Sequence, residues 1–112
     1  MNFSALAARL SLEHAAGPVP ASFDGVYAGD LLSRVMSRLE KDQLWITIMN
    51  NVNVVAVASL SEAAAVILAE GVSLLPDAAA AAEEKGIAVF RTEMTAYEIC
   101  REISRLADGG AI

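Results

Sequence analysis

Three polar segments, each directly after an apolar run, carry the side chains that could contact a polar small molecule. Amide groups suit the edges of a base or a sugar, and a hydroxyl group near a helix amino terminus suits an anion. Two carboxylates in these segments, Glu70 and Glu93, would repel a polyphosphate unless a cation lay between them. The candidate ligand-binding residues are Asn50, Asn51, Asn53, Glu70, Gly71 and Thr92.

The same segments also have a purely structural interpretation. Asparagine is common at turns and helix caps without any binding role. Arg91 and Glu93, which flank Thr92, are equally compatible with a solvated surface. Both interpretations stay open on the sequence alone.

No residues have the spacing of a catalytic, metal or phosphate-binding motif. The only histidine, His14, has no cysteine or carboxylate cluster placed to share a metal, and no GxxxxGK[ST] loop is present. The only cysteine, Cys100, falls on the apolar face of an expected helix, where a thiol is normally inert. We therefore expect no catalytic residue, no metal site and no cofactor. An enzyme would need a reactive Cys100.

Composition narrows the classes of partner. The chain has 112 residues, of which 55% are hydrophobic, and a net charge of -6. Clustered basic residues drive phosphate-backbone binding, so this acidic chain should not bind nucleic acid. Its apolar runs are too short to span a bilayer, and the first residues do not resemble a signal peptide. We expect a cytoplasmic protein that does not enter a membrane.

Helices alternating with short strands would position the polar segments. Apolar, β-branched runs predict strands at residues 44–49, 64–69 and 87–90. Helical spacing predicts helices at residues 3–12, 30–39 and 78–85 and one from Thr95 onward, where Thr95 and Glu98 form a capping box. Residues 18–29, rich in proline and glycine, should form a loop with at most a short strand.

The helix expected at residues 30–39 has a clear apolar stripe. Asp30 at its start can accept the free N–H groups of the first turn. The residues on the stripe are Leu31, Leu32, Val35, Met36 and Leu39.

Residues 52–60 are ambiguous, because their valines favour a strand. As a strand they would form a hairpin with the next apolar run, but the intervening residues lack the Asn-Gly or Asp-Gly of tight hairpins. As a helix they would begin at Asn51 or Asn53 and connect two parallel strands. We choose the helix. The expected fold is a single α/β domain over residues 1–112, with a small, mainly parallel sheet built from consecutive strand-helix units and covered by helices.

Four segments read in order resemble a DRTGG domain, a family similar to the N-terminal domain of HPr kinase/phosphorylase. They are Tyr27-Ala-Gly-Asp-Leu-Leu-Ser33, Leu44-Trp-Ile-Thr-Ile48, Asn53-Val-Val-Ala-Val-Ala-Ser-Leu60 and Gly86-Ile87. The chain departs from the family at the motif that gives the name. The motif positions are Pro20, Ala21, Asp24, Gly25 and Val26, and only Gly25 matches.

The resemblance implies a non-catalytic regulatory or assembly module. Such domains occur beside CBS domains in pyrophosphatases, where they contribute to a dimer interface, in some phosphotransacetylases, and as small proteins near hydrogenase-type genes. We therefore expect a regulatory homodimer with a redox or phosphotransfer enzyme as a further partner. The alternative is a sensor that binds an adenine nucleotide or a similar ligand at the carboxyl edge of the sheet.

Overall fold

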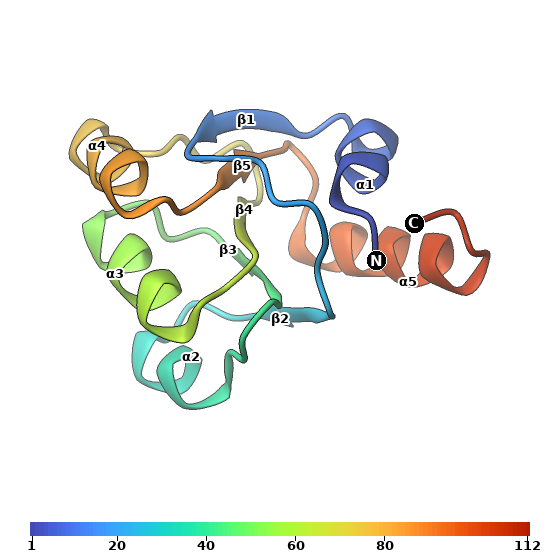
Figure 1. The fold of residues 1–112 in the computed structure, drawn as a ribbon, viewed down its shortest axis with the longest axis horizontal. Helices are drawn as coiled ribbons and strands as arrows, with labels where there is room; N and C mark the ends of the chain where they lie inside the picture. The colour runs from blue at the N-terminus through green and yellow to red at the C-terminus, as the bar shows by residue number, and fades with distance from the viewer.

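A computed structural model describes all residues from 1 to 112 and shows an α/β fold (Figure 1). Five strands form one sheet in the order β1-β5-β4-β3-β2; β2 to β5 run parallel, and β1 is antiparallel to β5. The elements in chain order are α1 (Phe3–Leu10), β1 (Glu13–Ala16), β2 (Val26–Ala28), α2 (Leu32–Arg38), β3 (Leu44–Thr47), α3 (Val52–Ser61), β4 (Ala65–Leu68), α4 (Pro76–Lys85), β5 (Val89–Arg91) and α5 (Ala96–Asp108). This confirms the expected fold class.

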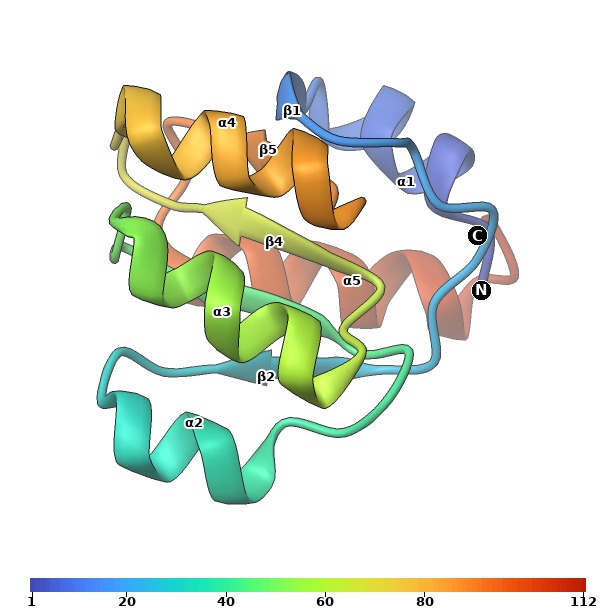
Figure 2. The same cartoon turned by 60° about the vertical axis from the view of Figure 1, so that its left-hand side comes forward.

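The sheet is covered on both faces, as Figures 1 and 2 show. Helices α2, α3 and α4 lie on one face, and α1 and α5 on the other. All four residues of β3 and of β4 are buried. This double burial explains why these strands read as continuous apolar runs. None of the helices has the length and the apolar composition that a membrane-spanning helix needs.

The choice of a helix after β3 is confirmed. The side chain of Asn51 caps α3 by accepting from the N–H of Asn53, and Glu62 ends the helix in the left-handed conformation, at φ 56°. Four residues of α3, three of them valines, are buried on the sheet. Packing therefore outweighs the preference of valine for strands. The capping box of Thr95 and Glu98 at the start of α5 is also confirmed.

Two strands were not among the three expected from the sequence. β1 lies between the expected helix at residues 3–12 and the expected loop at residues 18–29, and it pairs Glu13 with Arg91 on β5. β2 is the short strand allowed for within residues 18–29, and it pairs with β3. Both are edge strands with little apolar alternation, so their structure depends on a partner strand distant in the chain.

The predicted role of Asp30 was wrong. Helix α2 begins at Leu32 with Leu31 as its N-cap, and no side chain caps it. The predicted apolar stripe holds for Val35 and Leu39, which are buried, but Leu31 and Met36 are 67% and 53% exposed. Asp30 instead accepts from Thr47 and Ile48 at the end of β3, and α2 lies at the margin of the sheet because it follows the edge strand β2.

Candidate functional site

The parallel strands bring the three predicted polar segments to one edge of the sheet. Strands β3, β4 and β5 end there, and helices α3, α4 and α5 begin there. Ligands of open parallel sheets bind at such an edge. The candidate residues therefore lie at the same edge, but they differ in how many of their polar groups are free.

The three asparagines are mostly used in turns. Asn50 donates its side-chain amide to the carbonyl of Ser73 at 2.7 Å. Asn51 accepts from the backbone N–H of Asn53 at 3.1 Å. The side chain of Asn53 itself is exposed in the first turn of α3 and has no hydrogen bond within the chain.

Gly71 and Thr92 together build the turns that follow β4 and β5. Gly71 has φ 72°, and a side chain there would overlap the carboxylate of Glu93. Its carbonyl accepts from the guanidinium of Arg91 at 2.7 Å, and its N–H donates to the carbonyl of Thr92 at 2.9 Å. The Thr92 hydroxyl accepts from the N–H of Met94 at 3.2 Å. These contacts give both residues a structural role at the edge.

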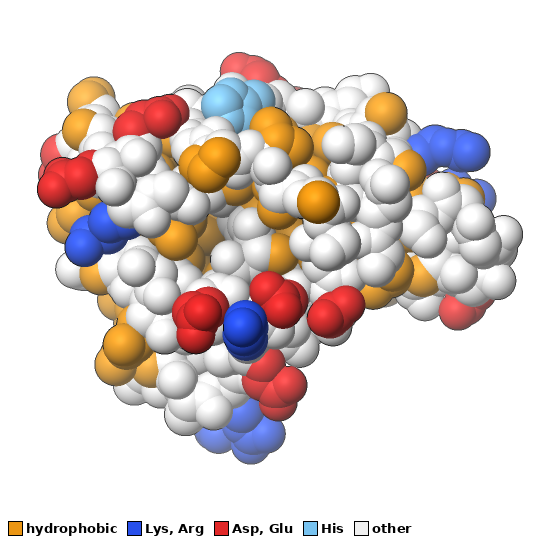
Figure 3. Space-filling model, viewed as in Figure 1, with side chains coloured by type: hydrophobic (Ala, Val, Ile, Leu, Met, Phe, Trp, Pro, Cys, Tyr) orange, Lys and Arg blue, Asp and Glu red, His pale blue; other side chains and the backbone are white.

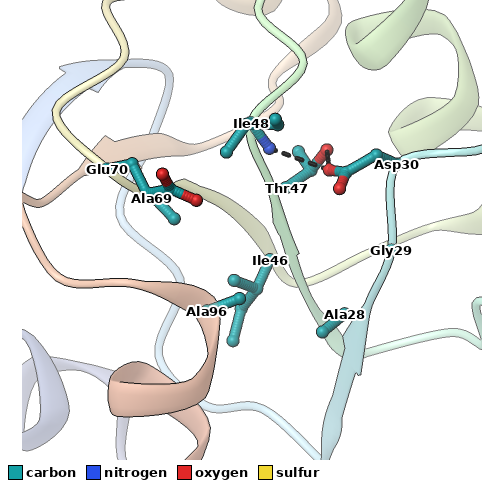
Figure 4. Close-up of a pocket in the computed structure, with 9 residues that line it drawn as sticks. All are labelled: Ala28, Gly29, Asp30, Ile46, Thr47, Ile48, Ala69, Glu70 and Ala96. Atoms are coloured by element: carbon teal, nitrogen blue, oxygen red, sulfur yellow. Dashed lines mark hydrogen bonds between the residues drawn. The ribbon is translucent and has the colours of Figure 1, made fainter.

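A depression of about 180 Å³ opens at this edge, between the ends of β2, β3 and β4 and the start of α5 (Figure 4). Of the six candidate residues, Glu70 lines it and the other five do not. Glu70 itself has φ 58°, in the left-handed region, so the chain turns sharply as it leaves β4. The lining residues are Ala28, Gly29, Asp30, Ile46, Thr47, Ile48, Ala69, Glu70 and Ala96.

Asp30 is fixed on the wall opposite Glu70 by two hydrogen bonds (Figure 4). Its Oδ1 accepts from the hydroxyl of Thr47 at 2.6 Å and from the N–H of Ile48 at 3.0 Å. The Thr47 hydroxyl also accepts from the N–H of Met49 at 3.1 Å, and this threonine is only 2% exposed. The network ties the end of β2 to the end of β3 and fixes a carboxylate beside the depression.

The charges of the depression determine what it can bind. Asp30 and Glu70 are its only charged lining residues, and both are acidic. Its floor is made of alanine and isoleucine side chains. Carboxylates accept hydrogen bonds and attract cations. The depression therefore suits an amino group or a cation and disfavours a bare phosphate.

Exposed apolar side chains surround the same edge. Nine large hydrophobic residues are well exposed, and five of them follow a parallel strand or begin a helix at this edge. Their common position at one edge makes this edge a candidate contact surface. The five are Leu31, Ile48, Val52, Leu75 and Tyr97.

Two groups were considered for catalysis, Cys100 and His14. Burial raises the pKa of the Cys100 thiol above its ordinary value, which disfavours the reactive thiolate. The Nε2 atom of His14 lies 2.6 Å from the carbonyl of Gly17. Because a carbonyl only accepts, this nitrogen donates. No group of three or more His, Cys, Asp or Glu side chains is placed to hold a metal ion.

The sequence missed Asp30 and Ile48 as residues of this edge. We expected Asp30 to cap a helix, because the short strand allowed for within residues 18–29 was given no bounds, and β2 ends two residues before Asp30. The Gly29-Asp30 pair could have indicated a strand end at this point in the sequence. It matches the other strand ends, where a polar or glycine residue follows an apolar run.

Comparison with known proteins supports the fold and gives the family. The model of the DRTGG domain matches residues 24–106. One similar solved structure contains the CBS and DRTGG domains of the regulatory region of the Clostridium perfringens pyrophosphatase, in complex with its activator diadenosine tetraphosphate. The TM-score is 0.70 at 13% identity, over 89% of this chain and 44% of that one. Curated proteins give no match. Since the family match spans most of the sequence, the chain belongs to the DRTGG domain family.

Proposed function

We propose that this DRTGG domain is a non-catalytic regulatory module that pairs with a second copy of itself through the carboxyl edge of the sheet. The observation that carries the proposal is the group of five exposed apolar residues at that edge. Partner enzymes of the redox or phosphotransfer class would respond to this pairing. The regulatory setting of the pyrophosphatase neighbour supports such a role, although the likeness at 13% identity extends only to the fold.

The size of the chain is compatible with pairing. A specific interface takes about 800 Å² from each copy, which is about one seventh of the 5612 Å² surface of this chain. Two side chains at the proposed interface stand well out from the surface, Leu31 at 67% and Tyr97 at 71% exposed. Burying large, exposed side chains of this kind supplies most of the energy of an interface.

The chain offers a matched control for testing this surface. Leu60 is 71% exposed, like Tyr97, but lies near the carboxyl end of α3, at the opposite edge of the sheet. Sedimentation equilibrium should show twice the chain mass of 11.7 kDa in the micromolar range. Tyr97→Glu should weaken pairing about tenfold or more, and Leu60→Glu should leave it unchanged. A monomer at all these concentrations, or an equal effect of both changes, would exclude the proposal.

A second candidate, a sensor of an adenine nucleotide, is supported by the depression between Asp30 and Glu70. Their carboxylates could accept from the exocyclic amino group of adenine, while the phosphates would extend away from them or need a cation. Adenosine and ATP with magnesium should then raise the melting temperature, because a ligand of the native state stabilises it. Glu70→Gln should reduce the shift and Glu93→Gln, outside the depression, should not. No shift with either ligand would exclude this candidate.

A further inference from the structure

A second depression lies outside the carboxyl-edge site, between β2 at the margin of the sheet and α2. It has a volume of about 260 Å³ and is lined by Tyr27, Arg34 and Arg38. The two arginines are four residues apart on α2, so their side chains lie on the same side of the helix. One half-buried aromatic ring and two exposed guanidinium groups therefore border a shallow, open depression.

The charges of these two arginines are not balanced within the chain. Neither takes part in an ion pair, whereas Arg91 pairs with Glu13 and Glu93, and Arg105 pairs with Glu102. The carboxylate four residues before Arg34 belongs to Asp30, and its Oδ1 is used by β3. The Arg34–Arg38 pair is thus a local positive site on a chain of net charge -6. Figure 3 shows basic side chains at the lower end of the molecule, near the position of α2 in Figure 1, with acidic side chains next to them and acidic and basic ones together in the lower middle.

Tyr27 supplies a third polar group and a flat wall. Its ring packs across Gly29, where an added Cβ would lie 3.0 Å from Cε2 of the ring. Its hydroxyl forms no hydrogen bond within the chain, although the residue is half-buried. The glycine lets the ring lie close to the backbone, and the hydroxyl group remains free to donate to a ligand.

We propose that Tyr27, Arg34 and Arg38 form a binding site for the phosphate group of a small phosphorylated molecule. A terminal phosphate presents three oxygens and is best held by several donors, and two guanidinium groups with a hydroxyl provide them. A carboxylate has fewer acceptor positions and a smaller charge. The volume of the hollow is below the range of about 300–1,000 Å³ typical of complete small-molecule pockets. It therefore accommodates a phosphate group but not a whole small molecule of ordinary size.

This site shares no residue with the depression around Asp30 and Glu70, and it does not depend on pairing of two chains. A polyphosphate bound at Arg34 and Arg38 avoids the repulsion that it would meet at the two carboxylates. Ligand-binding measurements therefore test the phosphate site, and sedimentation separately tests the pairing of two chains.

The test is titration calorimetry of the full chain with ATP and with inorganic tripolyphosphate, at low and high salt. We expect both probes to bind, and more weakly at high salt, because the contacts are ionic. Arg34→Gln and Arg38→Gln should each reduce affinity about tenfold, as expected for the loss of one charge-assisted contact. Tyr27→Phe should reduce it less, since one neutral donor is removed.

Arg9→Gln is the matched control, because Arg9 is an exposed arginine on α1 without an ion pair. Thermal unfolding of each variant checks that the fold is intact. An equal loss of affinity in Arg9→Gln would show general charge attraction and overturn the proposal. The proposal would also be overturned if neither ATP nor tripolyphosphate bound. The same holds if an acidic peptide bound at this site and the two phosphate probes did not.

Discussion

The hydroxyl of Thr47 should be a main determinant of both stability and the shape of the carboxyl edge. It donates to the carboxylate of Asp30 and accepts from the N–H of Met49, in a side chain that is 2% exposed. Thr47→Val keeps the shape of the side chain but removes both bonds. Thr47→Ser keeps the hydroxyl and removes only a methyl group, so it is the matched control.

The magnitude follows from these contacts. A hydrogen bond to a charged group contributes about 1.5–3 kcal/mol, and the N–H of Met49 loses its acceptor as well. Valine regains a few tenths of a kcal/mol through its preference for strands. We therefore expect Thr47→Val to lower the free energy of unfolding by about 2 kcal/mol, and Thr47→Ser by about 0.8 kcal/mol for one buried methyl group. For a chain of 112 residues the valine variant should melt about 8 °C lower.

Urea unfolding followed by the fluorescence of Trp45, which is fully buried on the same strand, measures both changes. The midpoint should shift while the slope stays constant, because the surface exposed on unfolding does not change. The Thr47→Val and Asp30→Ala changes should also be non-additive, since each removes the same bond. A valine variant as stable as the serine variant, or strict additivity with Asp30→Ala, would refute the role assigned to this bond.

Three further predictions concern other parts of the chain. Gly17→Ala should lower the free energy of unfolding by about 2 kcal/mol or more, because Gly17 has φ 76° and an added Cβ would overlap a backbone carbonyl. Gly86→Ala, at φ 68° and with no atom within 4 Å of the added Cβ, should lower it by only about 1 kcal/mol. Urea unfolding measures both changes. The backbone N–H and hydroxyl of Thr95 lower the pKa of Glu98 below its ordinary 4.5. The unchanged protein should therefore be more stable than the Glu98→Gln variant above pH 4.5, and this difference should disappear as the pH falls through the lowered pKa. An advantage that stayed constant with pH would contradict this. Burial raises the pKa of the Cys100 thiol, so Cys100 should react with a disulfide reagent more slowly in the native chain than in the unfolded chain. Equal reaction rates in the two states would contradict this prediction.

The sequence predicted those elements whose signal is local. The capping box at Thr95 acts within one helical turn, and β3 and β4 are apolar along their whole length because both faces are covered. The absence of a hairpin turn after residue 60 was enough to assign α3 correctly. The capping box acts between residues close together in the chain and the strands are marked by their total apolarity, whereas α3 also depends on its packing against the sheet.

The candidate site was only partly accessible to such reasoning. The sequence located the carboxyl edge and the residue Glu70, because the end of a buried strand is a local feature. It left open whether Asn50 binds a ligand or serves in a turn, and it assigned no turn to Thr92, since the partners of both side chains are selected by the packing of loops. Nor could it place Tyr27 beside Arg34, because β2 becomes a strand only through pairing with β3.

The sequence by itself therefore determined the family, the alternating order of elements and the buried strands, because hydrophobic pattern and helix caps are encoded over a few residues. The tertiary structure alone decided the two edge strands, the position of Asp30 and the free polar groups. An edge strand gains its hydrogen bonds only when a distant strand is in place. Asp30 could satisfy either the first turn of α2 or the end of β3, and the close approach of Thr47 decides the competition in favour of β3.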